Sequence, residues 1–430
     1  MPSSFLIAAP MSGSGKTTVA RGLMALLRRE GYSVQPMKCG PDYIDTKFHA
    51  AVCGRPSVNL DLFMATEDHV RQIYQKYTDN ADVCIVEGMM GLYDGYDHER
   101  GSAYDIARLL RLPVILVVDA RSAAYSMAAL IKGFADFRHD IAVAGVIFNK
   151  VGSERHQQML REVCHDIGIP CLGCLPKSKV AETGERYLGL DFSDIASDGQ
   201  VFHALADLIS QHIDWKELLR LTERAPILQS APAAGRPSQI SFRRIAIARS
   251  PEAFSFIYQN TLDIMSSADV CFFNPELDEV FPDDTDLLYL PGGYPEKHAE
   301  ALAKASKTRT CIKNYADKGG HVIAECGGMM YLCERILTDE GDFPMCGVLP
   351  YTITARTADR RLSLGYRQWT LDGKEYRGHE FHYSQFFETT PPSITSVLNA
   401  RGEPVNCPII RKGNVLASYT HWYFHELFNV

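Results

Sequence analysis

The fold of the first half of the chain is decided by residues 5–18, FLIAAPMSGSGKTT. A short apolar run leads into a loop of serines and glycines, and then into a helical pattern in which Val19, Leu23 and Leu27 share one face. A strand, a glycine-rich loop and a helix in this order are the setting that a phosphate-binding loop requires. Pro10 stands where the usual pattern has its first glycine, so a plain glycine- and serine-rich turn is the alternative.

The predicted phosphate loop consists of Ser12, Gly13, Ser14, Gly15, Lys16, Thr17 and Thr18. Its glycines let backbone N–H groups converge on phosphate oxygens, and the helix N-terminus adds its partial positive charge. Lys16 can reach the β- and γ-phosphates, and the hydroxyl of Thr17 can ligate Mg²⁺. The loop therefore predicts ATP as a ligand.

Polar residues follow several apolar runs, where the carboxyl ends of parallel strands line a ligand crevice. Glu87 follows residues 83–86 and is a candidate metal ligand, with a solvated loop acid as the alternative. Asp42 and Asp45 follow residues 34–38 and could bind Mg²⁺ or handle a carboxyl substrate, although turns are rich in aspartate. Asn149 follows residues 143–148 and could contact an adenine edge.

The apolar runs of the first half are short and rich in β-branched residues, at 5–9, 83–86, 114–118 and 143–148. Such runs are typical of strands covered on both faces, as in a parallel sheet with crossover helices. Residues 224–242 are rich in Pro, Ala and Ser, which favours an interdomain linker. Further strands are expected at 245–248, 270–273, 287–290 and 322–324. We therefore predict two α/β domains, 1–223 and 243–430.

In the second half, the sequence VIAECGG at 322–328 indicates a strand that runs into a sharp turn. The small residues Ala324, Gly327 and Gly328 permit a strained elbow that exposes a nucleophile. Cys326 would lie at a helix N-terminus, which we expect to lower the pKa of its thiol. His421 is the candidate base, since distance in sequence does not forbid contact in the fold. A buried structural thiol is the alternative.

Two further motifs flank this elbow. PGGYPE, at 291–296, follows a predicted strand, and the N–H groups of Gly292 and Gly293 could form an oxyanion hole. GHEFHYS, at 378–384, supplies two histidines. For these histidines, polar contacts around the site or a domain interface and plain core packing stay equally open.

The composition is that of an ordinary globular protein, with 46% hydrophobic and 22% charged residues and a net charge of −8 over 430 residues. It excludes a disordered chain, a fibrous repeat and a small disulfide scaffold, and the acidic balance argues against a general nucleic-acid binder. No apolar run approaches the roughly 18 residues of a membrane span, so we expect no membrane partner. The 12 cysteines are scattered, which fits a reducing cytoplasm, and we expect neither a zinc ribbon nor a redox motif.

With both halves assembled, the chain resembles the cobyrinic acid a,c-diamide synthase family from end to end. The segments that carry the resemblance are 12–18, 38–45, 87–95, 149–156, 185–190, 291–296, 324–332 and 378–384. The resemblance implies an N-terminal P-loop NTPase-like domain with a parallel sheet, similar to dethiobiotin synthetase. It also implies a C-terminal class I glutamine amidotransferase domain of flavodoxin-like fold and cobalamin type.

The same resemblance implies roles for the residues of the second half. Cys326 corresponds to the glutaminase nucleophile and His421 to its base. Most class I amidotransferases carry a glutamate two residues after this histidine, but the cobalamin branch lacks it. Tyr423 stands at that position here, which leaves open what orients His421.

In the first half, the resemblance links Asp42, Asp45, Glu87 and Asp94 to Mg²⁺–ATP or to the reacting carboxylates, with Thr17, Asp45 and Glu87 expected at the metal. Tyr43 and Ile44 fall where the family is thought to choose which carboxylate reacts. The family often has leucine at the second of these positions, so Ile44 leaves the order of amidation open.

The implied function is amidation of the a and c carboxylates of cobyrinic acid in cobalamin biosynthesis, with Mg²⁺, ATP and glutamine. The nearest rivals are the same chemistry on hydrogenobyrinic acid or nickel-sirohydrochlorin. Cobyric acid synthase shares the fold but is usually longer. A partitioning-type P-loop ATPase is a rival from another class, but it carries a lysine where this chain has Met11 and has no glutaminase. The expected partner is a corrinoid, without nucleic acid, and a homodimer stays open.

Overall fold

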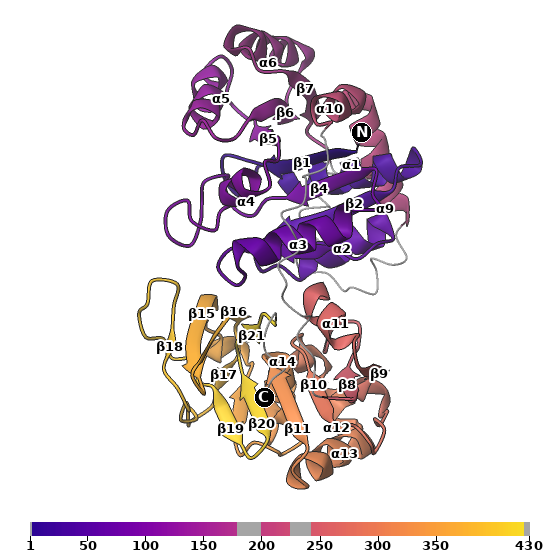
Figure 1. Cartoon of the computed structure of the whole chain (residues 1–430), viewed down its shortest axis with the longest axis vertical. Coiled ribbons are helices and arrows are strands. Elements are labelled where there is room, and N and C mark those ends of the chain that lie inside the picture. The colour runs from indigo at the N-terminus through magenta and orange to yellow at the C-terminus, as the bar shows by residue number, and fades with distance from the viewer. Residues whose placement is uncertain (1, 179–198, 224–241, 425–430) are drawn as a thin grey trace. The chain divides into compact units, whose positions relative to one another are not determined.

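The computed structural model describes residues 2–178, 199–223 and 242–424 of the chain. These residues form two compact units, Met1–Pro232 and Ala233–Val430 (Figure 1). The predicted linker at 224–242 lies outside the described residues except for Phe242, and so does the segment 185–190. Both units are α/β folds, which confirms the predicted fold class. The predicted domain limits themselves stay a prediction.

The first unit is built on seven parallel strands in the order β3-β2-β4-β1-β5-β6-β7. The strands are β1 (Ser3–Ala8), β2 (Val34–Cys39), β3 (Val58–Leu60), β4 (Val83–Glu87), β5 (Val114–Asp119), β6 (Val143–Val151) and β7 (Cys171–Pro176). Because β4 lies between β1 and β2, the loops that follow these three strands meet at one edge of the sheet. The phosphate loop and the predicted acidic residues are therefore brought to the same place.

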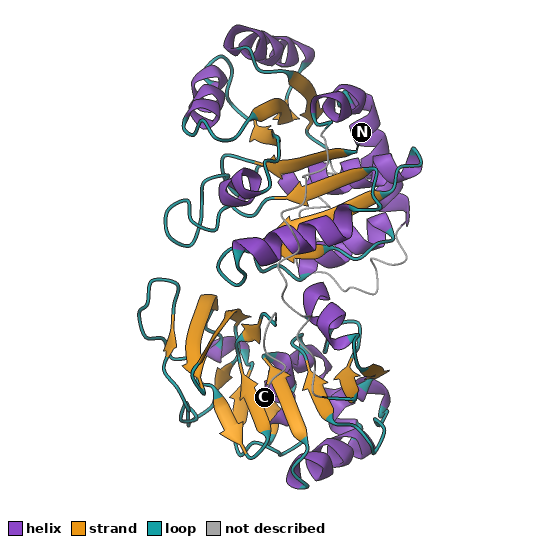
Figure 2. Cartoon of the chain, viewed as in Figure 1, coloured by secondary structure: helices purple, strands orange, loops and turns teal. Residues whose placement is uncertain are grey.

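Helices lie on both sides of this sheet (Figure 2). They are α1 (Lys16–Arg29), α2 (Ile44–Cys53), α3 (Glu67–Thr78), α4 (Ala103–Leu109), α5 (Met127–Asp136), α6 (Glu154–Ile167), α9 (Gly199–His212) and α10 (Trp215–Leu221). One core cluster joins α1, α9 and α10 to one face of the sheet, and a second joins α5 and α6 to the other face. Neighbouring residues of one strand, such as Ile115 and Leu116, enter different clusters, so both faces are buried as the continuous apolar runs predict.

The second unit contains a six-stranded sheet in the order β19-β20-β11-β10-β8-β9. The strands are β8 (Arg244–Ala248), β9 (Asp269–Phe273), β10 (Leu287–Leu290), β11 (His321–Glu325), β19 (Ile410–Lys412) and β20 (Val415–Ser418). All pairs are parallel except the one between β19 and β20. The nucleophile elbow follows β11, which lies in the interior of this sheet.

Two four-stranded sheets complete the second unit. One contains β13 (Asp342–Pro344), β12 (Arg335–Leu337), β14 (Thr352–Thr354) and β17 (Gln385–Phe386), and the other contains β18 (Val397–Leu398), β15 (Ser363–Leu371), β16 (Lys374–His382) and β21 (His421–Trp422). The helical segments are α11 (Gln259–Met265), η2 (Pro275–Leu277), η3 (Pro295–His298), α12 (Ala299–Lys304), α13 (Ser306–Asp317), α14 (Gly327–Leu332) and η4 (Thr357–Asp359). Pairing of β21 with β16 sets His421 opposite His379.

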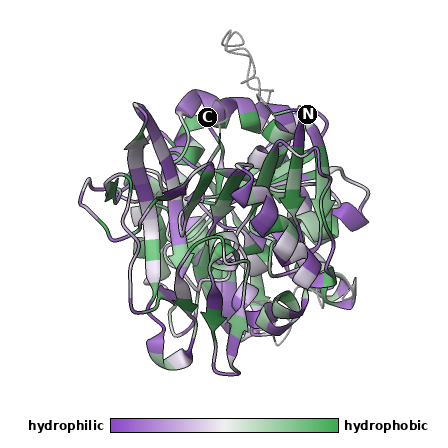
Figure 3. Ribbon diagram, turned by 90° about the horizontal axis from the view of Figure 1, so that it is seen from below, coloured by the Kyte–Doolittle hydropathy of each residue, from purple (hydrophilic) through white to green (hydrophobic). Residues whose placement is uncertain are grey.

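The hydropathy colouring shows deep green in many strands and alternating colours along the helices (Figure 3). Two predicted strand ends differ from the structure. Glu87 is the last residue of β4, and Asn149 lies inside β6, because that strand continues to Val151. Within the described ranges, no helix is long and apolar enough to cross a membrane.

Candidate active sites

The phosphate loop of the first unit depends on two glycines with left-handed backbone. Gly13 has φ 75° and Gly15, which caps α1, has φ 99°. A Cβ atom on Gly15 would lie 2.0 Å from Nδ2 of Asn149, so a side chain has no room there. The loop is therefore shaped by backbone conformations that most other residues would strain.

Asn149 and Lys150 hold this loop from β6. The buried Asn149 donates from Nδ2 to the carbonyl oxygen of Ser14 at 3.0 Å, and its Oδ1 accepts from the backbone N–H of Lys150 at 2.9 Å. Lys150 donates from Nζ to the carbonyl oxygen of Gly13 at 3.1 Å. Both ends of the Asn149 amide are thus engaged by the protein, and the contact with adenine stays a prediction.

Lys16 and Thr17 point toward the end of β4. Lys16 donates to the carbonyl oxygen of Met90, and Thr17 Oγ1 donates to Glu87 Oε1 at 2.6 Å. Burial and the nearby Lys38 ammonium lower the pKa of Lys16 to about 8. An anion that reached this lysine, such as a phosphate oxygen, would favour its protonated form.

Lys38 joins the predicted acidic residues, although the sequence reasoning gave it no role. Its Nζ lies 2.6 Å from Asp45 Oδ2, 2.9 Å from Glu87 Oε1 and 4.0 Å from Asp42 Oδ2. Burial alone would lower the pKa of Lys38, but the carboxylates outweigh it and hold that pKa well above its usual value. The sequence could have indicated this role, because a lysine within a buried strand such as β2 needs charged or polar partners.

Two more residues missed by sequence reasoning support these acids. Arg21 of α1 contacts Asp45 at 2.8 Å, and Nε2 of the fully buried His49 lies 2.7 Å from Glu87 Oε2. Lys38 and His49 outweigh burial and hold the pKa of Glu87 well below its usual value. The Glu87 carboxylate is therefore ionised, and ion pairs hold both Glu87 and Asp45 in place as oxygen donors.

The donor set fits Mg²⁺ bound together with a nucleotide. Lys38 contacts the carboxylates of Asp45 and Glu87, and the hydroxyl of Thr17 donates to Glu87. These side chains offer one hydroxyl and two carboxylates, and oxygen is the donor that Mg²⁺ prefers. No group of three or more His, Cys, Asp or Glu among the described residues can hold a metal ion by itself. Mg²⁺ commonly uses one or two carboxylates and completes its shell with phosphate oxygens and water, so these residues fit that mode.

The remaining predicted residues of this unit surround the same edge. Asp42 Oδ1 accepts from the backbone N–H groups of Ile44 and Asp45 at 2.9 and 2.8 Å, while burial and Asp45 raise the pKa of Asp42 to about 6. Tyr43 is only 7% exposed, whereas Ile44 is half-buried. The exposed Asp94 accepts from the N–H of Gly91 at 2.9 Å.

Cys326 forms a strained elbow between β11 and α14. Its φ of 44° and ψ of −106° lie outside the usual regions for a residue with a side chain. Its N–H donates to Ser418 of β20 at 2.7 Å, and a Cβ on Gly328 would lie 2.1 Å from the carbonyl oxygen of Leu290. The small residues named from the sequence are what let this turn pack against β10.

The expectation of a lowered pKa for Cys326 is wrong for this structure. Cys326 is 4% exposed, and its burial, followed by the charge of Glu296, raises the pKa of the thiol well above its usual value. The N–H of Gly327 opposes this shift but does not overcome it. The resting side chain is therefore a neutral thiol that needs a base.

His421 and the two glycines of the PGGYPE motif lie at this elbow. A Cβ on Gly292 would lie 2.2 Å from Cε1 of His421, and a Cβ on Gly327 would lie 3.0 Å from the backbone nitrogen of Gly293. Burial and His379 hold the pKa of His421 well below its usual value, so its imidazole is neutral and can accept a proton. The structure thus brings the predicted base and the predicted oxyanion residues to one place.

The GHEFHYS motif forms part of the wall behind His421. The ring of His379 stacks on His421 with centroids 4.9 Å apart, and its Nδ1 lies 2.8 Å from the hydroxyl of Tyr258. Glu380 binds Arg367 and, at 2.7 Å, His382. The two histidines that sequence reasoning left open are therefore buried polar contacts next to the elbow.

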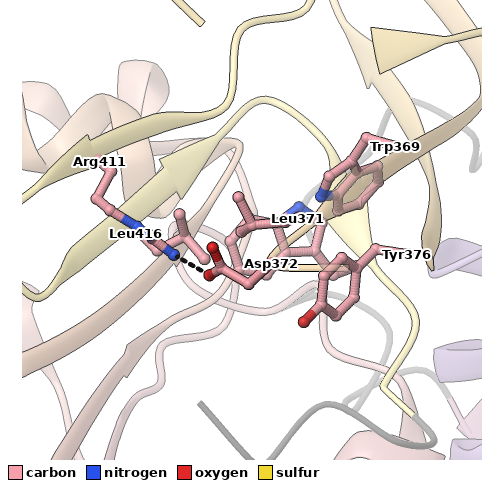
Figure 4. Close-up of a pocket in the computed structure, with 7 residues that line it drawn as sticks. Trp369, Leu371, Asp372, Tyr376, Arg411 and Leu416 are labelled. Carbon is pink, nitrogen blue, oxygen red and sulfur yellow. Dashed lines mark hydrogen bonds and ion pairs between the residues drawn. The ribbon is translucent and has the colours of Figure 1, made fainter. Parts of the chain in front are cut away.

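A pocket of the same unit contains none of the predicted catalytic residues (Figure 4). It is lined by Trp369, Leu371, Asp372, Tyr376, Arg411, Leu416 and Trp422. Its two charged groups pair with each other, since Arg411 Nη2 lies 3.1 Å from Asp372 Oδ2. Its lining includes Trp422, the residue that follows His421 in the chain.

The expectation of no redox motif overlooked Cys171 and Cys174, which form a C-x-x-C pair in β7. A register shift against β6 near Gly173 turns both toward the core cluster that contains Cys164 of α6. The three side chains are in hydrogen-bonding contact, Cys171 with each of the others. All 12 cysteines lie in the described part of the chain, and none of them forms a disulfide.

Two family models match the chain and divide it between the two units. Residues 5–190 match the CobQ/CobB/MinD/ParA nucleotide binding domain. Residues 244–427 match the CobB/CobQ-like glutamine amidotransferase domain. The phosphate loop falls within the first match, and Cys326 and His421 fall within the second.

Curated relatives match almost the whole chain. It is 40% identical to hydrogenobyrinate a,c-diamide synthase of Brucella abortus, over 97% of both chains. It is 39% identical to cobyrinate a,c-diamide synthase of Caldanaerobacter subterraneus, over 97% of this chain and 94% of the relative, and 37% identical to the Listeria innocua enzyme of that name, over 98% and 96%. Among solved structures, a glutamine amidotransferase from Thermotoga maritima is 14% identical, with a TM-score of 0.29, over 41% of this chain and 75% of that one.

Proposed function

The chain belongs to the family of cobyrinate and hydrogenobyrinate a,c-diamide synthases, and from this membership we propose that it converts the a and c carboxylates of a corrin-type acid into amides. It is a glutamine-dependent amide ligase of cobalamin biosynthesis, with ATP as the second co-substrate. The observation that carries the proposal is the 40% identity to such a synthase over 97% of the chain.

The first unit activates the carboxylate. A carboxylate oxygen attacks the γ-phosphorus of ATP, the bond to the bridging oxygen breaks, and an acyl phosphate and ADP result. Lys16 and the N–H groups of residues 13–18 stabilise the charge that develops on the phosphate oxygens. Ammonia then attacks the acyl carbon, and inorganic phosphate leaves as the amide forms.

Thr17, Asp45 and Glu87 would hold Mg²⁺ with the nucleotide, and bound Mg²⁺ would neutralise phosphate charge. We assign Lys38 the task of keeping Asp45 and Glu87 in place, since it contacts both. Asn149 keeps the phosphate loop in shape through its bond to Ser14. Asp42, Ile44 and Asp94 lie at the same edge and face the substrate in this proposal.

The second unit supplies ammonia. His421 takes the proton of Cys326, and the thiolate attacks the side-chain amide carbon of glutamine. The N–H groups of Gly292 and Gly293 receive the developing oxyanion. The imidazolium returns the proton to the leaving nitrogen, ammonia departs, and water hydrolyses the thioester to glutamate. Because the nucleophile must remain a thiol, we place the reaction in the reducing cytoplasm.

Product analysis tests this function. The purified chain is incubated with Mg–ATP, glutamine and either cobyrinic acid, hydrogenobyrinic acid or nickel-sirohydrochlorin, and the products are identified by mass spectrometry. We expect a diamide from cobyrinic or hydrogenobyrinic acid, and the ratio of their kcat/KM values identifies the preferred one. Formation of no amide from either acid, by a chain that hydrolyses glutamine, would overturn the substrate assignment.

A further inference from the structure

The position where most class I amidotransferases carry a glutamate for the histidine holds Tyr423 in this chain. The ring of Tyr423 is buried and packs edge-on against Tyr258 with centroids 5.3 Å apart. A phenol in this setting does not supply the negative charge that stabilises an imidazolium. The residue that orients His421 must therefore come from elsewhere in the fold.

Glu325 lies where such a residue is needed. It is the last residue of β11, directly before Cys326, and only 1% of it is exposed. Its Oε2 lies 3.8 Å from Nδ1 of His421, the ring nitrogen that a catalytic carboxylate faces in a nucleophile–histidine–acid triad. Catalytic hydrogen bonds are often long without substrate and shorten in the complex.

The carboxyl group of Glu325 is fixed by two other contacts. Its Oε1 accepts from the backbone N–H of Trp422 at 3.2 Å, which ties it to the residue that follows His421. The hydroxyl of Tyr289, on the neighbouring strand β10, is hydrogen-bonded to it as well. Oε1 therefore faces the N–H of Trp422, and Oε2 is the oxygen that lies near His421. Burial raises the pKa of the Glu325 carboxyl well above its usual value, and the hydrogen bonds from Trp422 and Tyr289 oppose that shift.

The other carboxylate that acts on His421 is already engaged. Glu380 influences the pKa of His421, but it binds both Arg367 and His382. The titratable groups around His421 are therefore His379, His382, Glu380 and Glu325, and the Glu325 carboxyl lies 3.8 Å from its Nδ1.

We propose that Glu325 is the positioning residue of the glutaminase site: it accepts a hydrogen bond from Nδ1–H of His421 and leaves the Nε2 lone pair free for the proton of Cys326. When that proton moves from Sγ to Nε2, the imidazolium beside Glu325 favours the ionised form of its carboxyl, and the thiolate is released for attack. The inference rests on the proposed roles of Cys326 and His421. It places the third member of the triad next to the nucleophile in sequence.

The variant Glu325→Gln tests the proposal. With Oε1 held by the N–H of Trp422, the amide nitrogen would face Nδ1 and favour the wrong imidazole tautomer. We expect kcat for glutamine-dependent amidation to fall on the order of 10³- to 10⁴-fold, as for the analogous change in a serine protease, with little change in the KM for glutamine. Glu375→Gln, an exposed glutamate of β16, is the matched control.

A second measurement separates positioning from structural damage. The rate of alkylation of Cys326 by iodoacetamide, followed on its peptide by mass spectrometry, is measured across pH. We expect Glu325→Gln to slow alkylation near neutral pH and to approach the wild-type rate at alkaline pH, where the thiol ionises without a base. A disrupted fold would instead expose the thiol and speed alkylation at every pH, and that result would overturn the proposal.

Three further results complete the test. Tyr289→Phe removes one donor to Glu325, and we expect it to lower kcat in the same direction but less. Ammonia-dependent amidation should be unchanged in Glu325→Gln, since it does not use His421. Unchanged glutamine kinetics in that variant would overturn the role of Glu325, whereas glutamine-dependent activity in Cys326→Ala would overturn the proposed site itself.

Discussion

We expect the synthetase reaction to depend most directly on Lys16. It is the lysine of the predicted phosphate loop, and burial beside Lys38 lowers its pKa to about 8. A bound anion would therefore stabilise its charged form. We predict that Lys16→Ala lowers amidation with either glutamine or ammonia by at least about a hundredfold, since a charge on the transferring phosphate loses its partner. Steady-state assays with both nitrogen donors check this, and normal amidation would exclude the phosphate-loop assignment.

Lys38 is a second buried lysine at this sheet edge, and we expect its role to be structural. Its ammonium is 4% exposed and lies between Asp45 and Glu87, so Lys38→Met leaves two buried carboxylates short of a partner. We predict a loss of about 3–5 kcal/mol in the stability of the first unit. Hydrogen–deuterium exchange of peptides from β2 and β4 should speed up accordingly.

Lys132→Met provides the control for this prediction. Lys132 lies in the same unit and pairs with Asp136, but both side chains of that pair are about half exposed. Exposed pairs contribute about 0–1 kcal/mol, so exchange in β2 and β4 should be unchanged. Equal effects of the two substitutions would show that Lys38 does not hold the carboxylates together.

Sequence reasoning named the residues whose chemistry is visible in a local motif, but it gave no role to Lys38, His49 or Glu325, whose partners come from elsewhere in the fold. Cys326 stands in a recognisable elbow, and Lys16 in a recognisable loop. Glu325 and His421 are distant in sequence, and only the pairing of β11 with β20 and of β16 with β21 brings them together. The expectation of a lowered pKa for Cys326 was wrong because burial outweighs the effect of the adjacent N–H. The motif alone does not reveal how deeply the thiol is buried.

At the scale of elements, strands such as β4, β5 and β6 were predictable because continuous β-branched runs suit strands buried on both faces, whereas β3, β7, β19 and β20 were not predicted. The ends of the strands were harder to predict. The predicted strand ending at Phe148 continues to Val151, and this places Asn149 beneath the phosphate loop instead of in a loop of its own. The small sheets of the second unit were not predicted, since strands such as β17 and β18 have only two residues each.

The segment from Asp42 into α2 is the element that we expect to select the reacting carboxylate. Ile44 is half-buried at the edge that carries Asp42 and Glu87, whereas Tyr43 is only 7% exposed. We predict that Ile44→Ala changes the ratio of mono- to diamide more than it changes ATP affinity, and that Tyr43→Ala acts in the same direction. A displacement of about 1 Å in a reacting group can cost on the order of a hundredfold in rate.

Asp94→Asn belongs to the same test. It should stall the reaction at one stage, so that a monoamide accumulates or no amide forms. Liquid chromatography with mass spectrometry follows the products over time. Product ratios that are unchanged in all three variants would show that neither loop contacts the substrate.

At the scale of the whole molecule, the two reactions are assigned to separate units. We predict that Cys326→Ala loses glutamine-dependent amidation by more than about a thousandfold, because its nucleophile is gone. The same variant should keep ammonia-dependent amidation, because Lys16 and Glu87 lie in the other unit. Assays with glutamine and with a high concentration of ammonia distinguish these outcomes, and a folded variant that fails with both would contradict the division.

The raised pKa of Cys326 has a consequence for the lifetime of the enzyme. Peroxide and other cellular oxidants attack thiolates far faster than thiols, and the first product, a sulfenic acid, can proceed to irreversible forms. A nucleophile that is buried and protonated between turnovers is shielded from this chemistry. In the proposed mechanism, only the transfer of its proton to His421 makes the sulfur reactive, so the thiolate would exist for no longer than the reaction requires.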